Sequence, residues 1–315
     1  MLMFALRGIA VSLTFFVLVY CLVSAFVAVV WRSLHLLRIR EKTLADSLFL
    51  LRVLPLATSL VITLVFVVPS FQILEPRAAN EGMGSTPLAL GLCALGLLAC
   101  GCFRVISAQA KTSRVVSRWL EGASPLDGTA HAVTLQARRE APPLTLVGIR
   151  RPRVLISEST VALLSHDELR IALQHERAHV RAHDNLKKLI FRFCPFPGMS
   201  KLESAWSQAA EMAADDAACA CQDNAVDLAA ALVKLSRLVP VAAAPVCTVG
   251  FVTGSLSVRV ARLLAWNGDA AGKSQSSPVR AWYAVPPALV ALSLIFVGYG
   301  PVLALTHEVT EWLVR

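Results

Sequence analysis

Four long apolar runs constrain this chain more than any other feature of its sequence. They predict membrane-spanning helices at about residues 8–31, 53–74, 86–106 and 281–306, because a helix needs about 20 mostly apolar residues to cross a bilayer. Only 16% of the 315 residues are charged, whereas a soluble domain carries about 25%. The first run is longer than the apolar core of about 7–15 residues in a cleaved signal peptide, so we expect it to be retained. The sequence therefore predicts an integral membrane protein with the lipid bilayer as a partner.

The distribution of basic residues sets the expected orientation of these helices, because Lys and Arg collect in cytoplasmic loops. Residues 32–52 are basic, the loop of residues 75–86 has Arg77 as its only basic residue, and basic residues return directly after the third run. We therefore expect the amino terminus and the tail of residues 307–315 outside, and residues 108–280 in the cytoplasm. The net charge of +9 agrees with an excess of Lys and Arg in cytoplasmic loops. The sequence has no basic run interleaved with aromatic residues, so we do not expect direct nucleic-acid binding.

The cytoplasmic segment is expected to be an α+β domain inserted between the third and fourth membrane helices. Two of its strand-like stretches flank Arg150-Arg151-Pro152 and predict a hairpin. Ser165 and Glu168 match a capping box, which predicts a helix that starts there and continues to about Lys188. The predicted strands are residues 132–137, 144–149 and 153–157, and further helices are predicted at about 201–220, 224–238 and 256–266.

The helix that begins after Ser165 contains a His-Glu-x-x-His motif, His175, Glu176 and His179. Positions i and i+4 share one helix face, so both imidazoles can reach one ion. Glu176 lies to the side of that face, from where it can act on a water at the same ion. Two nitrogen ligands with a carboxylate base predict a zinc hydrolase with one zinc ion.

A third protein ligand is needed, because a catalytic zinc takes three protein ligands and water. Glu211 is the best candidate, since it lies among alanines in a helix that can approach the motif helix closely. Asp215 is four residues further on and shares its face. We expect Asp215 to accept a hydrogen bond from the free ring nitrogen of a ligand histidine and so fix its tautomer.

Other polar residues near the motif are expected to have structural or solvated roles. Asp184, five residues after His179, is expected to act at the end of the motif helix, in the shell of residues around the site. Cys219 and Cys221 lack a CxxC spacing, so we interpret them as small residues of an Ala-rich helix rather than metal ligands. The residues expected at the solvated surface are His183, Asp216, Arg259 and Arg262.

The sequence between the third and fourth apolar runs resembles the BlaR/MecR-type family of integral-membrane metallopeptidases. The segments that carry the resemblance are HERAHVRAHDN, EMAAD, PRVLISESTVALLSHDEL and SLSVRVARLL. The resemblance implies a zincin-like domain in a multi-pass protein of a bacterial-type cell membrane. It also implies zinc ligation by His175, His179 and Glu211, with Glu176 as the general base. The best-known members carry an extracellular penicillin-binding sensor after the fourth helix. This sequence ends at Arg315, so we expect the sensing partner to be a separate protein or the membrane helices themselves.

The expected function is that of a membrane-embedded zinc endopeptidase in regulatory proteolysis. The family suggests a protein substrate, either a cytosolic transcriptional repressor or the chain itself, and the substrate could pair with an edge strand at residues 144–149 or 153–157. One alternative is a membrane signalling or scaffold protein that binds zinc without cleaving, against which Glu176 argues. Another alternative is a quality-control protease of the HtpX type. The continuation of the motif by Asp184 and Asn185 favours the BlaR/MecR-type family instead.

Overall fold

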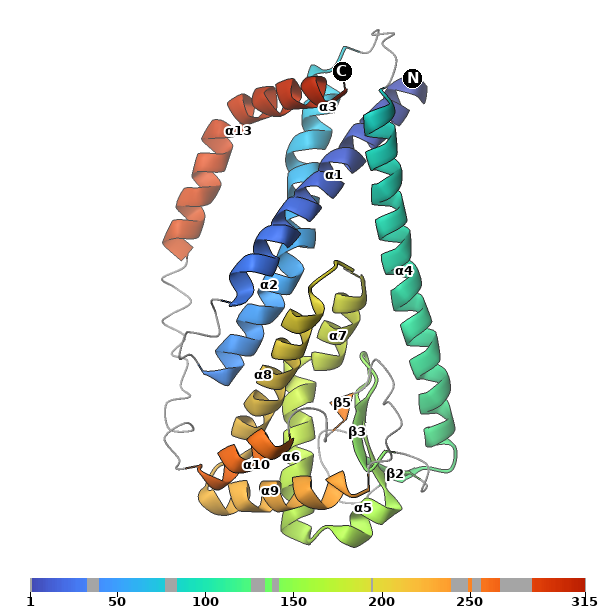
Figure 1. The fold of residues 1–315 in the computed structure, drawn as a ribbon, viewed down its shortest axis with the longest axis vertical. Coiled ribbons are helices and arrows are strands. Elements are labelled where there is room, and N and C mark those ends of the chain that lie inside the picture. The colour runs from blue at the N-terminus through green and yellow to red at the C-terminus, as the bar shows by residue number, and fades with distance from the viewer. Residues whose placement is uncertain are drawn as a thin grey trace. The chain divides into compact units, whose positions relative to one another are not determined.

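The computed structural model describes residues 2–32, 40–76, 84–125, 134–137, 142–193, 195–238, 249–250, 256–266 and 285–314 (Figure 1). The chain divides into two compact units. Unit 1 comprises Met1–Arg32, Leu51–Cys100 and Gln275–Arg315, and unit 2 comprises Ser33–Leu50 and Gly101–Ser274. The predicted mainly helical composition with one small sheet is confirmed.

Unit 1 is built from long apolar helices. Among the residues that the structure describes, three helical stretches are long and apolar enough to cross a membrane, namely Met3–Val30, Glu41–Leu74 and Ser85–Leu120. The fourth predicted span falls on α13 (Val285–Val314), whereas residues 281–284 lie outside the described residues. That α13 crosses a membrane stays a prediction. The helices that lie in unit 1 in whole or in part are α1 (Leu2–Val30), α2 (Glu41–Ile62), η2 (Thr63–Val67), α3 (Val68–Leu74), α4 (Ser85–Leu120) and α13. The part of α2 before Leu51 and the part of α4 from Gly101 onward belong to unit 2.

The second apolar stretch contains a π-helical turn, η2, between α2 and α3. Pro69 has no N–H, so it cannot donate to the carbonyl of Val65, four residues earlier. The hydroxyl of Tyr299 on α13 donates to this carbonyl at 2.9 Å. Ser70, next to the proline, donates through its hydroxyl to the carbonyl of Leu303 at 3.1 Å. These two hydroxyl–carbonyl hydrogen bonds attach α13 to the second apolar stretch within unit 1.

The sheet of unit 2 has the strand order β1-β2-β4-β3-β5. The predicted hairpin is confirmed, because β3 and β4 pair antiparallel with Val147 opposite Arg153. β4 also pairs in parallel with β2, so residues 153–157 are central in the sheet and the expectation that they form an edge is wrong. β3 pairs with β5 through Thr145 and Leu146, so it is not a free edge either. The strands are β1 (Ser124–Pro125), β2 (Thr134–Ala137), β3 (Leu144–Val147), β4 (Arg153–Ser157) and β5 (Val249–Gly250), and residues 132–133 of the predicted first strand lie outside the described residues.

The capping box at the start of α6 (His166–Ala182) is confirmed. The backbone N–H of Ser165 donates to Glu168 Oε2 at 2.8 Å, and the N–H of Glu168 donates to Ser165 Oγ at 3.2 Å. The prediction that this helix continues to Lys188 is wrong, because His183 has a positive φ of 56° and ends α6. The other helices of unit 2 are α5 (Glu158–Leu163), α7 (Asp184–Phe193), α8 (Ser200–Ala218), α9 (Gln222–Ser236) and α10 (Leu256–Leu264).

The core of unit 2 lies between the sheet and helices α6, α9 and α10. Ile171 of α6, Leu228 and Leu232 of α9, and Leu263 of α10 are buried in one apolar cluster with Ile156 of β4. Each fully buried side chain of this size contributes about 1.5–3 kcal/mol through removal from water. The cluster fixes the two helices, α6 and α10, that carry several of the polar side chains described below.

Candidate metal centre

Three predicted ligands converge in unit 2. The Nε2 atoms of His175 and His179 on α6 lie 3.1 Å apart. Glu211 on α8 places Oε2 3.6 Å from His175 Nε2 and Oε1 3.8 Å from His179 Nε2. Zinc bonds of about 2.0–2.1 Å at tetrahedral angles separate neighbouring ligand atoms by about 3.3 Å. The spacing and the two-nitrogen, one-carboxylate donor set therefore fit one zinc ion.

The other ring nitrogen of each histidine faces a buried carboxylate. His175 Nδ1 lies 2.9 Å from Asp215 Oδ1, and His179 Nδ1 lies 2.6 Å from Asp184 Oδ2. A proton held on Nδ1 by a carboxylate leaves the lone pair of Nε2 directed at the shared point between the ligands. The structure thus brings Asp215 to the position expected from the sequence. It also gives Asp184 a direct contact with the motif, beyond a role at a helix end.

The position of Asp184 depends on the break at His183. On a continuous helix, a residue five positions after His179 would point about 140° away from it around the axis. The left-handed conformation of His183 ends α6, and Asp184 begins α7 with its side chain turned back to His179. His183 itself is exposed, as predicted. Histidine is among the residues that adopt this conformation more often than others, which is the one local signal for the break.

Asn185, next in the chain, connects α7 to the hairpin. Its amide nitrogen donates to the carbonyls of Leu146 at 3.3 Å and Gly148 at 3.0 Å. Gly148 has a φ of +88°, and a Cβ added there would lie 2.7 Å from the carbonyl oxygen of Arg151. The turn therefore needs glycine at this position. The carbonyl of Gly148 accepts the hydrogen bond from the Asn185 side chain, and this bond fixes the start of α7.

Sequence reasoning missed Arg259 as part of the site. The expectation that it is solvated is wrong, because it is 3% exposed and reaches two of the carboxylates. Its Nε and Nη2 donate to Asp215 Oδ2 and Oδ1 at 2.8 and 2.6 Å, and its Nη1 lies 2.9 Å from Glu211 Oε2. The signal in the sequence was its position within the apolar stripe of α10, between Leu256 and Leu263 at helical spacing.

Arg262 lies one turn further along α10 and has a different environment. It pairs with Asp216 at 2.6 Å, and the two side chains are 28% and 27% exposed. Both residues are thus half-buried partners of each other rather than independent solvated charges. They lie on the same pair of helices as Arg259 and Asp215, and among the described residues neither forms a hydrogen bond or ion pair with the three predicted ligands. Substitution of Arg262 is therefore a suitable control for substitution of Arg259.

The pKa values of the site follow from burial and from these contacts. Burial alone would raise the pKa of Asp215, but hydrogen bonds with Arg259 and His175 outweigh it and lower the pKa to about 2. Burial would also raise the pKa of Glu211, whereas His179, His175 and Arg259 lower it. For His175 burial acts to lower the pKa, and the neighbouring Asp215 and Glu211 raise it to about 9. Both acids are therefore held as carboxylates.

Glu176 has the opposite environment. It is fully buried, and neither carboxylate oxygen has a hydrogen-bond partner among the residues that the structure describes. Burial raises the pKa of this carboxyl group. A buried carboxylate without a partner costs several kcal/mol or more unless an ion or an ordered water meets it. An acidic group that no described residue satisfies therefore lies beside the three converging ligands.

Acidic groups gather around the three converging ligands. Arg259 contacts Glu211 and Asp215, and the ammonium of Lys187 lies 3.8 Å from Asp184. Glu176 has no hydrogen-bond partner among the described residues. A cation at the point shared by the two Nε2 atoms and Glu211 would place positive charge beside this carboxyl group.

Comparison with known proteins bears on the same region. The model of the family described as BlaR1 peptidase M56 matches residues 87–263, more than half of the chain. The matched stretch begins in α4, ends in α10 and contains all of the side chains described above. No curated protein matches the chain.

Proposed function

The chain belongs to the BlaR1 peptidase M56 family, and on this premise we propose that it is an integral-membrane zinc endopeptidase. One observation carries the proposal. The Nε2 atoms of two histidines and the carboxylate of Glu211 face one point, and the unsatisfied carboxylate of Glu176 lies beside them. Membership of the family implies a membrane-associated metallopeptidase. The metal, the residues in their roles and the regulatory purpose are the parts that we propose.

His175, His179 and Glu211 would hold the zinc ion, with Asp215 and Asp184 fixing the two imidazoles. Two nitrogens and one oxygen are a donor set that zinc accepts in hydrolases and that leaves a fourth position open. When bound, zinc supplies Lewis-acid chemistry, because it polarises the scissile carbonyl and makes water more acidic. Arg259 on α10 holds Glu211 and Asp215 in place and limits the charge repulsion between them.

Glu176 carries the proton transfers in this proposal. It removes a proton from the attacking water and delivers that proton to the leaving amine nitrogen. A buried carboxyl group with a raised pKa is suited to both steps, because a pKa closer to neutrality lets one group accept and then release a proton. Neither of its oxygens accepts a hydrogen bond from the described protein atoms, so both are available to water.

The basic loops support the orientation that we propose for the protein in its membrane. Spans at 8–31, 53–74, 86–106 and 281–306 would place the peptidase domain of residues 108–280 in the cytoplasm and the amino terminus outside. The substrate would then be a cytosolic protein, such as a transcriptional repressor, or the chain itself. A separate sensor protein or the membrane helices would supply the stimulus.

The test is zinc content together with peptide-bond cleavage in purified full-length protein. Wild type, Glu176→Gln and Glu158→Gln are compared in detergent, with Glu158 as an exposed control outside the site. We expect about one zinc per chain in all three and cleavage, of the chain itself or of a repressor encoded beside it, by all except Glu176→Gln.

Three outcomes would contradict the proposal in different ways. Zinc in every variant with cleavage by none would favour a zinc-binding signalling or scaffold protein. Cleavage by Glu176→Gln at the wild-type rate would remove Glu176 from its role. Wild type that purifies without zinc and gains none on addition would refute the metal site itself.

A further inference from the structure

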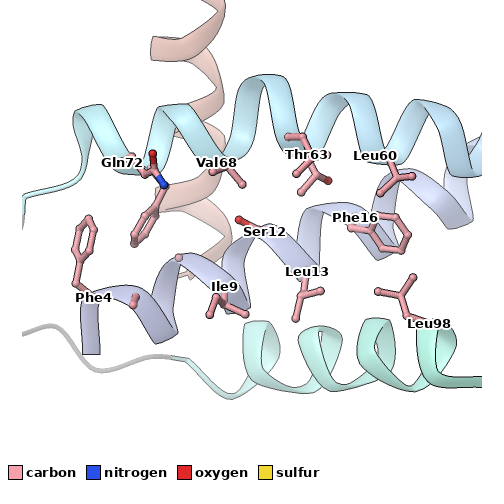
Figure 2. A pocket seen from close by; sticks show the side chains of 14 residues that line it. Phe4, Ile9, Ser12, Leu13, Phe16, Leu60, Thr63, Val68, Gln72 and Leu98 are labelled. Atoms are coloured by element: carbon pink, nitrogen blue, oxygen red, sulfur yellow. The ribbon is translucent and has the colours of Figure 1, made fainter. Parts of the chain in front are cut away.

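Unit 1 contains a pocket whose lining has no charged side chain. Its volume is about 490 Å³, within the range of about 300–1,000 Å³ that is typical of small-ligand sites. The walls come from α1, from the continuous stretch of α2, η2 and α3, and from Leu98 of α4 (Figure 2). The polar side chains in the lining are those of Ser12, Thr63 and Gln72.

The pocket is long and narrow. Its lining extends from Phe4 to Phe16 along α1 and from Leu60 to Gln72 along the opposite wall, and Figure 2 shows Phe4 and Phe16 at opposite ends. Twelve residues of helix cover about 18 Å. This shape suits one unbranched hydrocarbon chain better than a compact ligand of the same volume.

The hollow has an identifiable cause in the sequence. Ala5, Gly8 and Ser12 recur at helical spacing on one face of α1, where larger side chains would fill the space. Phe71 packs against the gap at Gly8, because a Cβ added there would lie 2.8 Å from Phe71 Cε1. The π-turn η2 contributes Thr63 and Leu64 to the opposite wall, and such turns occur frequently at functional sites.

We propose that this pocket binds a single acyl chain of a bilayer phospholipid. Its lining includes Ile9, Leu60 and Leu64, which are 56%, 41% and 62% exposed, so an apolar ligand can enter from the hydrocarbon around the helices. The three helices that form it are those long and apolar enough to cross a membrane. Gln72 lies at the same end of the pocket as Phe4 (Figure 2), near the end of the second apolar stretch. Its amide can hydrogen-bond the ester or phosphate of the head group while the chain extends toward Phe16.

The test uses the full chain in vesicles of phosphatidylethanolamine and phosphatidylglycerol that contain a trace of phosphatidylglycerol with a diazirine on its acyl chain. After irradiation, the labelled residues are mapped by mass spectrometry. We expect several-fold more label on the pocket residues of α1 and of η2 than on Leu22 and Phe26. These two control positions lie on α1 outside the pocket and are 73% and 62% exposed.

A pair of variants separates the pocket from general contact with lipid. Ser12→Phe places a large ring midway along the pocket and should abolish the label there, whereas Leu22→Phe, on an exposed part of α1, should leave it unchanged. If Ser12→Phe does not fold, the comparison of label between pocket residues and the control positions Leu22 and Phe26 in wild type still tests the proposal. Equal labelling of pocket and control positions would mean only surrounding lipid and would overturn the proposal. Labelling of the pocket by a free diazirine fatty acid, but not by the phospholipid, would also overturn it in favour of a free acid.

Discussion

Replacing Arg259 with methionine in the metal-free protein is expected to destabilise unit 2 by about 3–5 kcal/mol. The change removes a guanidinium that donates to both oxygens of Asp215 and contacts Glu211, and these acids are 1% and 2% exposed. Breaking a buried ion pair from one side costs about 3–5 kcal/mol, because the remaining charge stays buried without its partner. Here two carboxylates lose the same cation.

The matched control is Arg262→Met on the same helix. Its pair with Asp216 is more than a quarter exposed at both side chains, so its loss should cost about 0–1 kcal/mol. Denaturant unfolding in detergent, followed by the fluorescence of tryptophans that include the buried Trp206, measures both variants against wild type. Arg259→Lys should fall between wild type and Arg259→Met, because lysine keeps the charge but cannot bridge both acids as the guanidinium does. Equal destabilisation by the two methionine variants, or less than about 1 kcal/mol for Arg259→Met, would refute the reasoning.

Three further predictions concern the immediate surroundings of the ligands. Asp184→Asn should weaken zinc binding about 10–100-fold in competition with a chelating dye, because it removes the carboxylate that orients an imidazole; unchanged affinity would contradict this. His183→Val should destabilise unit 2 by about 1–2 kcal/mol and His183→Gly should not, because only the β-branched residue resists the left-handed conformation; unfolding measurements that reverse this order would contradict it. The pKa of Asp215 is lowered from 3.8 to about 2, so it contributes about 2 kcal/mol of stability above pH 4 that disappears as the pH falls through 2. Wild type should therefore lose stability over this range more steeply than Asp215→Asn, and parallel pH profiles would contradict the assignment.

The sequence was informative wherever the relevant signal is local. The capping box at Ser165 and Glu168, the hairpin, and the facing imidazoles of His175 and His179 all follow from spacings of a few residues. Small residues surround Glu211, which favours a close approach of its helix, and the structure places its carboxylate opposite both imidazoles. These features depend on residue types and spacings within a few turns of one element.

What the sequence did not predict depends on partners that are distant along the chain. Arg259 meets an acid 44 residues earlier, and no periodicity within α10 indicates which acid faces it. Asp184 reaches His179 only because one residue between them leaves the helical conformation. The central position of β4 follows from its parallel pairing with β2, which no turn between them encodes.

Zinc K-edge X-ray absorption of the purified full-length protein tests the proposed ligation of zinc by two imidazoles and a carboxylate in unit 2. We expect a first shell of nitrogen and oxygen at about 2.0–2.1 Å, with the outer scattering of two imidazoles that falls to one in His175→Ala. A shell of sulfur at about 2.3 Å, as ligation by Cys219 and Cys221 would give, or a spectrum that is the same in His175→Ala, would contradict the claim.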